Sequence, residues 1–96
     1  MYLIRVTFQT KSEMAKELVK KFKQAVPYME KVGFKNIKIL TDAVSNYWTV
    51  IIESEVTTLA DVENTKGFTS KPEVKEIMKD YFSLVIGGHR EIFNIE

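Results

Sequence analysis

One histidine and one arginine, both on strand-like segments, are the residues of this chain best suited to chemistry. His89 is the only histidine, and histidine is the side chain that exchanges a proton near neutral pH without help from its surroundings. It could act as a general base while Arg5 holds an oxyanion that develops on the substrate. A structural interpretation competes with this one, because His89 directly follows Gly87 and Gly88, as an ordinary first residue of a strand would.

Four further side chains are candidates for binding a ligand near this pair. Tyr47 offers a hydroxyl donor, and Thr7 lies on the same segment as Arg5. Glu53 could act as a base if burial made its carboxylate a stronger proton acceptor. Glu91 could pair with Arg5, either directly or through another strand. Together they describe a polar site for a small molecule.

The last strand-like segment has two faces, and either could line such a site. His89 and Glu91 alternate with Arg90 and Ile92, so the two pairs point to opposite sides of a sheet. We favour the face of His89 and Glu91, because Glu91 would then lie within reach of Arg5.

The order of periodicities along the chain predicts the elements that position these residues. Period-two alternation indicates strands at residues 2–9, 36–41, 47–55 and 89–95. Apolar residues at spacings of three and four indicate amphipathic helices at residues 14–32 and, with a break at Gly67, at residues 58–86. This β-α-β-β-α-β order predicts an α+β, ferredoxin-like βαββαβ fold, with a four-stranded antiparallel sheet and helices on one face. We expect one domain over residues 1–96.

The helix ends carry local signals. Thr10 and Glu13 have the spacing of a capping box at the start of the first helix. Gly33 fits the left-handed position after its last turn. Ser70 is expected to cap the last helix, which should run until Gly87.

The sheet face turned away from the helices has a mixed character. Alternation places Trp48 with Val50 in the core, under the helices. It places the following residues on the other face: Leu3, Arg5, Thr7, Lys38, Leu40, Tyr47, Thr49, Ile51 and Glu53. Burying a large apolar side chain stabilises by about 1.5–3 kcal/mol, whereas an unpaired buried charge is costly. We therefore expect a second copy to cover this face, giving a homodimer with a partly enclosed small-molecule pocket in each subunit.

Composition restricts the classes of partner and cofactor. A net charge of +1 provides no field for capturing nucleic acid or acidic membranes. The chain has no cysteine, which excludes disulfides and thiolate sites. One histidine and scattered carboxylates show no ligand spacing, so neither a metal nor another cofactor is expected. No segment approaches the roughly 20 apolar residues of a membrane span, and we expect a cytoplasmic protein.

The pattern resembles the dimeric α+β barrel superfamily, which includes antibiotic-biosynthesis monooxygenase-like and NIPSNAP-like domains. The resemblance rests on residues 2–8, 39–42 and 88–93 and extends over essentially the whole chain. It implies two sheets facing each other, with ligands inside the barrel or between sheet and helices. In a haem-degrading relative His89 would be an iron ligand, but such relatives carry an asparagine on the first strand, where this chain has Arg5 and Thr7.

Two classes of function follow from the residues and the resemblance together. The first is a cofactor-independent monooxygenase-like or related small-molecule enzyme. The second is a non-catalytic small-molecule-binding or interaction module that acts as a homodimer. An enclosed position for His89 would favour the first class, and an open one would favour the second.

Overall fold

The β-α-β-β-α-β order is present in the computed structural model, which describes residues 1–44, 47–62 and 69–96. Its elements are β1 (Tyr2–Thr10), α1 (Ala15–Lys31), β2 (Lys35–Thr41), β3 (Thr49–Val56), α3 (Pro72–Ile77), the 3₁₀ turn η1 (Tyr81–Ser83) and β4 (Val85–Asn94). Residues 60–62 are also helical. The expected break at Gly67 lies outside the described residues.

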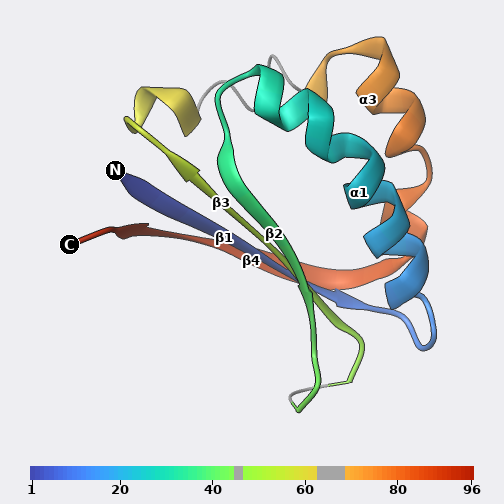
Figure 1. Cartoon of the computed structure of the whole chain (residues 1–96). Coiled ribbons are helices and arrows are strands. Elements are labelled where there is room, and N and C mark those ends of the chain that lie inside the picture. Colours follow the sequence, from blue (N-terminus) through green and yellow to red (C-terminus); the bar gives the residue numbers. More distant parts are fainter. Residues whose placement is uncertain (45–46, 63–68) are drawn as a thin grey trace.

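The four strands form one antiparallel sheet in the order β2-β3-β1-β4. Figure 1 shows α1 and α3 together on one side of this sheet. The predicted α+β ferredoxin-like fold is therefore confirmed. The first and last strands are direct neighbours, which decides a point that the sequence left open.

The core lies between α1, α3 and the helix side of the sheet. Leu18 from α1, Val50 and Val56 from β3, and Val74 from α3 are essentially inaccessible to solvent. These residues occupy the apolar stripe of each helix and the inward positions of the strand. Among the described residues, no helix is long and apolar enough to cross a membrane.

The start of α1 differs from the prediction. Thr10 is the buried last residue of β1, and both its backbone N–H and its hydroxyl donate to the carbonyl of Trp48, at 2.8 and 2.9 Å. Thr10 belongs to β1 and lies too far before the first turn of α1 to cap it. α1 therefore begins at Ala15, after Met14 and without a side-chain cap.

The end of α1 is as predicted. Gly33 has a φ of +104°, and its N–H donates to the carbonyl of Glu30 at 3.2 Å. The N–H of Phe34 donates to the carbonyl of Met29 at 3.2 Å, which completes the usual glycine-terminated ending of a helix.

The last helix is shorter than the sequence pattern predicts. α3 ends at Ile77, and Asp80 has a φ of 65°, a conformation that cannot continue a right-handed helix. The N-cap of α3 is Lys71 and not Ser70, and Lys71 makes no side-chain cap hydrogen bond. β4 then begins at Val85, so Gly87 lies inside the strand and does not end a helix.

Candidate functional site

Four charged residues lie side by side across the sheet, on the face opposite the helices. In the strand register Lys38 of β2 faces Glu53 of β3, Glu53 faces Arg5 of β1, and Arg5 faces Glu91 of β4. We call this set, Lys38-Glu53-Arg5-Glu91, the charge row. Its signs alternate from one edge of the sheet to the other.

Arg5 forms its close ion pair with Glu53 and not with Glu91. The Nε of Arg5 donates to the Oε2 of Glu53 at 2.7 Å. The Glu53 side chain is 13% exposed and the Arg5 side chain 39% exposed. The Arg5 guanidinium also lies over the ring of Phe93, 5.3 Å from its centre. Arg5 is thus held on two sides, as expected of a positioned cation.

His89 lies beside the charge row, in an open position. It faces Thr7 in the register of β1 and β4, and its Nε2 is 3.6 Å from the Oε1 of Glu91. Its side chain is 64% exposed. The structure therefore brings Arg5, Thr7, Glu53, His89 and Glu91 together on one sheet face, and leaves that face open in the single chain. Their roles stay predictions.

Gly88 explains how β4 approaches β1 so closely beside this group. A Cβ atom at Gly88 would lie 2.6 Å from the backbone oxygen of Thr7, which is closer than side chains tolerate. Glycine is therefore required there for steric reasons.

Tyr47 is separate from the other candidates. It precedes β3 and its side chain projects from the end of the β2–β3 hairpin, with 81% of the residue exposed. Its carbonyl accepts a hydrogen bond from the Gln9 side-chain amide. The expected strand from residue 47 starts only at Thr49.

Trp48 is not a core residue, contrary to the prediction. It has a φ of 64° and is 37% exposed. A left-handed residue interrupts strand alternation, so the pattern of β3 does not carry Trp48 into the core, and its side chain lines a hollow between the hairpin and α1 instead. Alternation could not reveal this, because an aromatic residue next to β-branched ones is typical of a strand interior.

A cavity of about 560 Å³ lies on the other side of the sheet, between the strands and the helices. Most of its wall is apolar and includes Ile4, Val6, Phe22, Met29, Val74 and Met78. Lys75 and Arg90 also line it. Arg90 lies on the other face of β4, the alternative to the face of His89 and Glu91. None of the six predicted site residues lines this cavity.

Solved structures provide the comparison with known proteins. An uncharacterised NIPSNAP domain protein from Burkholderia xenovorans superposes with a TM-score of 0.84 at 7% identity, over 100% of this chain and 95% of that one. A NIPSNAP family protein from Agrobacterium tumefaciens gives a TM-score of 0.84 at 10% identity, over 99% and 92%.

The chain has the NIPSNAP-like fold. An antibiotic biosynthesis monooxygenase-like protein from Chloroflexus aurantiacus shares this fold, with a TM-score of 0.77 at 10% identity over 99% of this chain and 93% of that one. The resemblance inferred from the sequence is confirmed at the level of fold. At these identities the NIPSNAP-like fold does not specify an activity. No family model matches the chain, and no curated protein does.

Among the residues that the structure describes, no group of three or more histidine, aspartate or glutamate side chains could hold a metal ion.

Proposed function

We propose that this protein binds a small apolar molecule with an anionic head in the cavity between sheet and helices, and that it works as a homodimer. The cavity of about 560 Å³, with apolar walls and the two cations Lys75 and Arg90, is the observation that supports ligand binding. Ligand pockets of globular proteins have this size and this mixture of apolar walls and few polar groups.

The cation of Arg90 supplies the specificity in this proposal. Its guanidinium has no recorded ion pair within the described part of the chain. A planar guanidinium binds a carboxylate or phosphate through two parallel hydrogen bonds. The apolar body of the ligand would lie against Ile4, Phe22 and Met29, and its head would meet Arg90.

Native mass spectrometry of freshly purified protein tests this proposal, because a retained ligand appears as added mass. Isothermal titration with decanoate tests it independently. Arg90→Gln should weaken decanoate binding about tenfold, a loss of about 1.4 kcal/mol. Ala25→Leu, which fills a buried wall position, should abolish binding.

Lys35→Gln is the matched control, because this exposed lysine on β2 does not line the cavity. Circular dichroism verifies that each variant folds. Wild-type protein without added mass and without measurable decanoate binding would refute the proposal. So would an Arg90→Gln variant that binds as the wild type does.

The dimer part of the proposal is supported by the symmetry of the charge row. Consider two copies whose sheets face each other, related by a two-fold axis that runs parallel to the strands, midway between β3 and β1. This axis reverses the order of the charge row in the second copy. Lys38 then faces Glu91, and Glu53 faces Arg5, so every cation meets an anion. Leu40 and Phe93, which are exposed on the same face, would be covered as well.

Charge reversal tests this arrangement by light scattering after size exclusion. Arg5→Glu produces a row with one cation and three anions, and should yield monomers. The double variant Arg5→Glu with Glu53→Arg has two cations followed by two anions, which is again complementary to its own reverse, and should restore the dimer. A wild-type chain that is monomeric at micromolar concentration would refute the dimer.

A second candidate function is catalysis on the sheet face, favoured by the gathering of Arg5, Thr7 and His89 there. A covering copy would enclose His89 so that it could remove a proton from the substrate. In a cofactor-independent oxygenation the substrate supplies the electrons: a CH₂ group becomes C=O, and the second oxygen atom leaves as water. The wild type should consume oxygen when it is given the ligand that native mass spectrometry identifies in the purified protein. His89→Ala should lose this oxygen uptake. Equal uptake by this variant and the wild type would exclude the role.

A further inference from the structure

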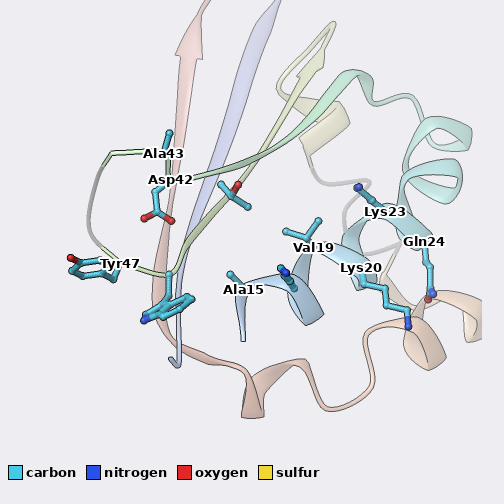
Figure 2. Close-up of a pocket in the computed structure, with 11 residues that line it drawn as sticks. Ala15, Val19, Lys20, Lys23, Gln24, Asp42, Ala43 and Tyr47 are labelled. Atoms are coloured by element: carbon cyan, nitrogen blue, oxygen red, sulfur yellow. The ribbon is translucent and has the colours of Figure 1, made fainter. Parts of the chain in front are cut away.

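We propose a second ligand site, separate from the cavity, which binds a planar aromatic molecule that carries a negative charge. The site is the hollow of about 910 Å³ between the first half of α1 and the loop end of the β2–β3 hairpin, here named the hairpin hollow. Figure 2 shows Asp42, Ala43 and Tyr47 on its hairpin side and Ala15, Val19, Lys20 and Lys23 on its helix side.

The aromatic wall of the hairpin hollow is held in place by the backbone. Trp48 has a φ of 64°, a conformation that is unfavourable for a bulky side chain and persists only where the surroundings impose it. The Trp48 carbonyl accepts two hydrogen bonds from Thr10, which tie this residue to the end of β1. Trp48 is partly exposed, and its indole lines the hairpin hollow.

Tyr47, the residue before Trp48, supplies a second aromatic ring. Tyr47 also lines the hairpin hollow, and most of its surface is exposed. Two adjacent rings that the fold leaves accessible offer flat surfaces on which a planar ligand can stack. Ala15 and the half-buried Val19 provide an apolar floor on the helix side.

The charge of the hairpin hollow is positive. Lys16, Lys20 and Lys23 line it at spacings of four and three, which places them one turn apart on one side of α1. No ion pair or side-chain hydrogen bond is recorded for them in the described part of the chain. By contrast, the Nζ of Lys21 donates to the carbonyls of Ile77 and Lys79, at 3.2 and 2.6 Å.

One acid lies among these lysines, and it already has a partner. The Oδ1 of Asp42 accepts a hydrogen bond from the backbone N–H of Thr49 at 2.9 Å, which closes the hairpin. Three cations against one anion leave an excess of positive charge. Lysines one turn apart also repel each other, and an anion that bridges them would relieve this repulsion. The ligand class is therefore an aromatic carboxylate, sulfonate or phosphate.

The protein contains its own probe for this site, because Trp48 is the only tryptophan. A titration of the full chain with 4-nitrobenzoate should quench its fluorescence, since nitroaromatic rings quench a stacked indole. The neutral analogue 4-nitrobenzamide and the non-aromatic anion cyclohexanecarboxylate should each bind at least tenfold more weakly. Raising NaCl from 50 to 500 mM should weaken 4-nitrobenzoate binding, because salt screens exposed charges.

Variants identify the residues involved. The triple variant Lys16→Gln, Lys20→Gln and Lys23→Gln should lose at least tenfold in affinity for 4-nitrobenzoate. The matched control Lys11→Gln, Lys35→Gln and Lys79→Gln removes the same charge from exposed positions elsewhere and should bind as the wild type does. Trp48→Leu, followed by calorimetry, should also lose binding.

Several results would overturn the proposal: equal losses in the two triple variants, binding that leaves Trp48 fluorescence unchanged, or equal affinity for 4-nitrobenzamide. A hexaglutamate peptide that binds as tightly as 4-nitrobenzoate would also overturn it, because the site would then recognise charge alone. Decanoate should not displace 4-nitrobenzoate, which separates the hairpin hollow from the cavity of the proposed function.

Discussion

The ion pair between Arg5 and Glu53 is expected to stabilise the fold measurably, and a double-mutant cycle tests this. Arg5→Met keeps an unbranched apolar side chain beside Phe93, while Glu53→Gln keeps the shape of the carboxylate and removes its charge. Each change removes one charged partner of a 2.7 Å bond. The double variant removes both, so the cycle isolates the contribution of the pair.

The magnitude follows from the burial of the two side chains. Exposed ion pairs contribute about 0.2–1 kcal/mol, and losing one partner of a buried pair costs about 3–5 kcal/mol. Glu53 is 13% exposed and Arg5 is 39% exposed, so this pair lies between the two limits. We expect Arg5→Met to cost about 2 kcal/mol, because it leaves the less exposed carboxylate without its partner. The coupling energy should be about 1–1.5 kcal/mol.

The assay is urea unfolding of all four proteins, followed by circular dichroism at one protein concentration. A common concentration is required because dimerisation would stabilise the folded state by mass action. Additive effects, with a coupling energy below about 0.3 kcal/mol, would show that the pair adds nothing to stability. If the double variant lost more free energy of unfolding than the two single variants lose together, the result would contradict the argument even more directly.

Three further predictions concern backbone and surface positions. Gly88→Ala should destabilise by about 1–3 kcal/mol in urea unfolding, since its Cβ would meet the Thr7 oxygen at 2.6 Å. Gly87→Ala, with nothing within 4 Å, should change stability by less than about 1 kcal/mol, and equal losses in both variants would contradict the steric reason. Gly33→Ala should cost about 1–2 kcal/mol in the same assay, because its φ of +104° is strained for alanine; unchanged stability would refute this. Leu40→Glu should shift the light-scattering mass from dimer to monomer at micromolar concentration, and an unchanged dimer would show that this face is not the interface.

Much of the fold could be predicted because alternation and helical spacing are repeated over many residues. The run from Tyr2 to Gln9 alternates throughout, and the stripe from Met14 to Val32 has a single interpretation. The fold then follows from the order of the elements, since sequential strands and helices pack in few ways. The glycine-terminated end of α1 could also be predicted, because Gly33 satisfies a local requirement.

The failures occurred where a distant contact overrides a local signal. Thr10 has the spacing of a helix cap, but it is the last residue of β1 and its hydroxyl donates to the carbonyl of Trp48, 38 positions away. Trp48 is an aromatic residue next to β-branched ones, as in a strand interior, but it has a left-handed conformation. In the last helix the apolar stripe continues past Ile77, although the helix has ended and Asp80 is left-handed. A pattern of hydrophobicity does not encode such left-handed positions.

The candidate site was predictable only in part, for a related reason. Strand alternation alone places Arg5, Thr7 and Glu53 on one face, and the choice of His89 over Arg90 for the same face agrees with the register. Which anion pairs with Arg5 depends on side-chain reach across neighbouring strands, and the sequence favoured Glu91. The cavity and its Arg90 required the packing of α3 over the sheet, which no local pattern specifies.

The two proposed functions make different demands on assembly, and this difference separates them. The cavity with Arg90 lies on the helix side, away from the sheet face proposed as the dimer interface, so we expect its ligand to bind without a second copy. His89 lies on the opposite face with 64% of its side chain exposed, and water around an exposed base weakens every electrostatic contribution to catalysis. Monomers produced by Leu40→Glu should therefore keep decanoate affinity and lose any activity of His89. Loss of both, in a variant that remains folded, would mean that the cavity too depends on the dimer.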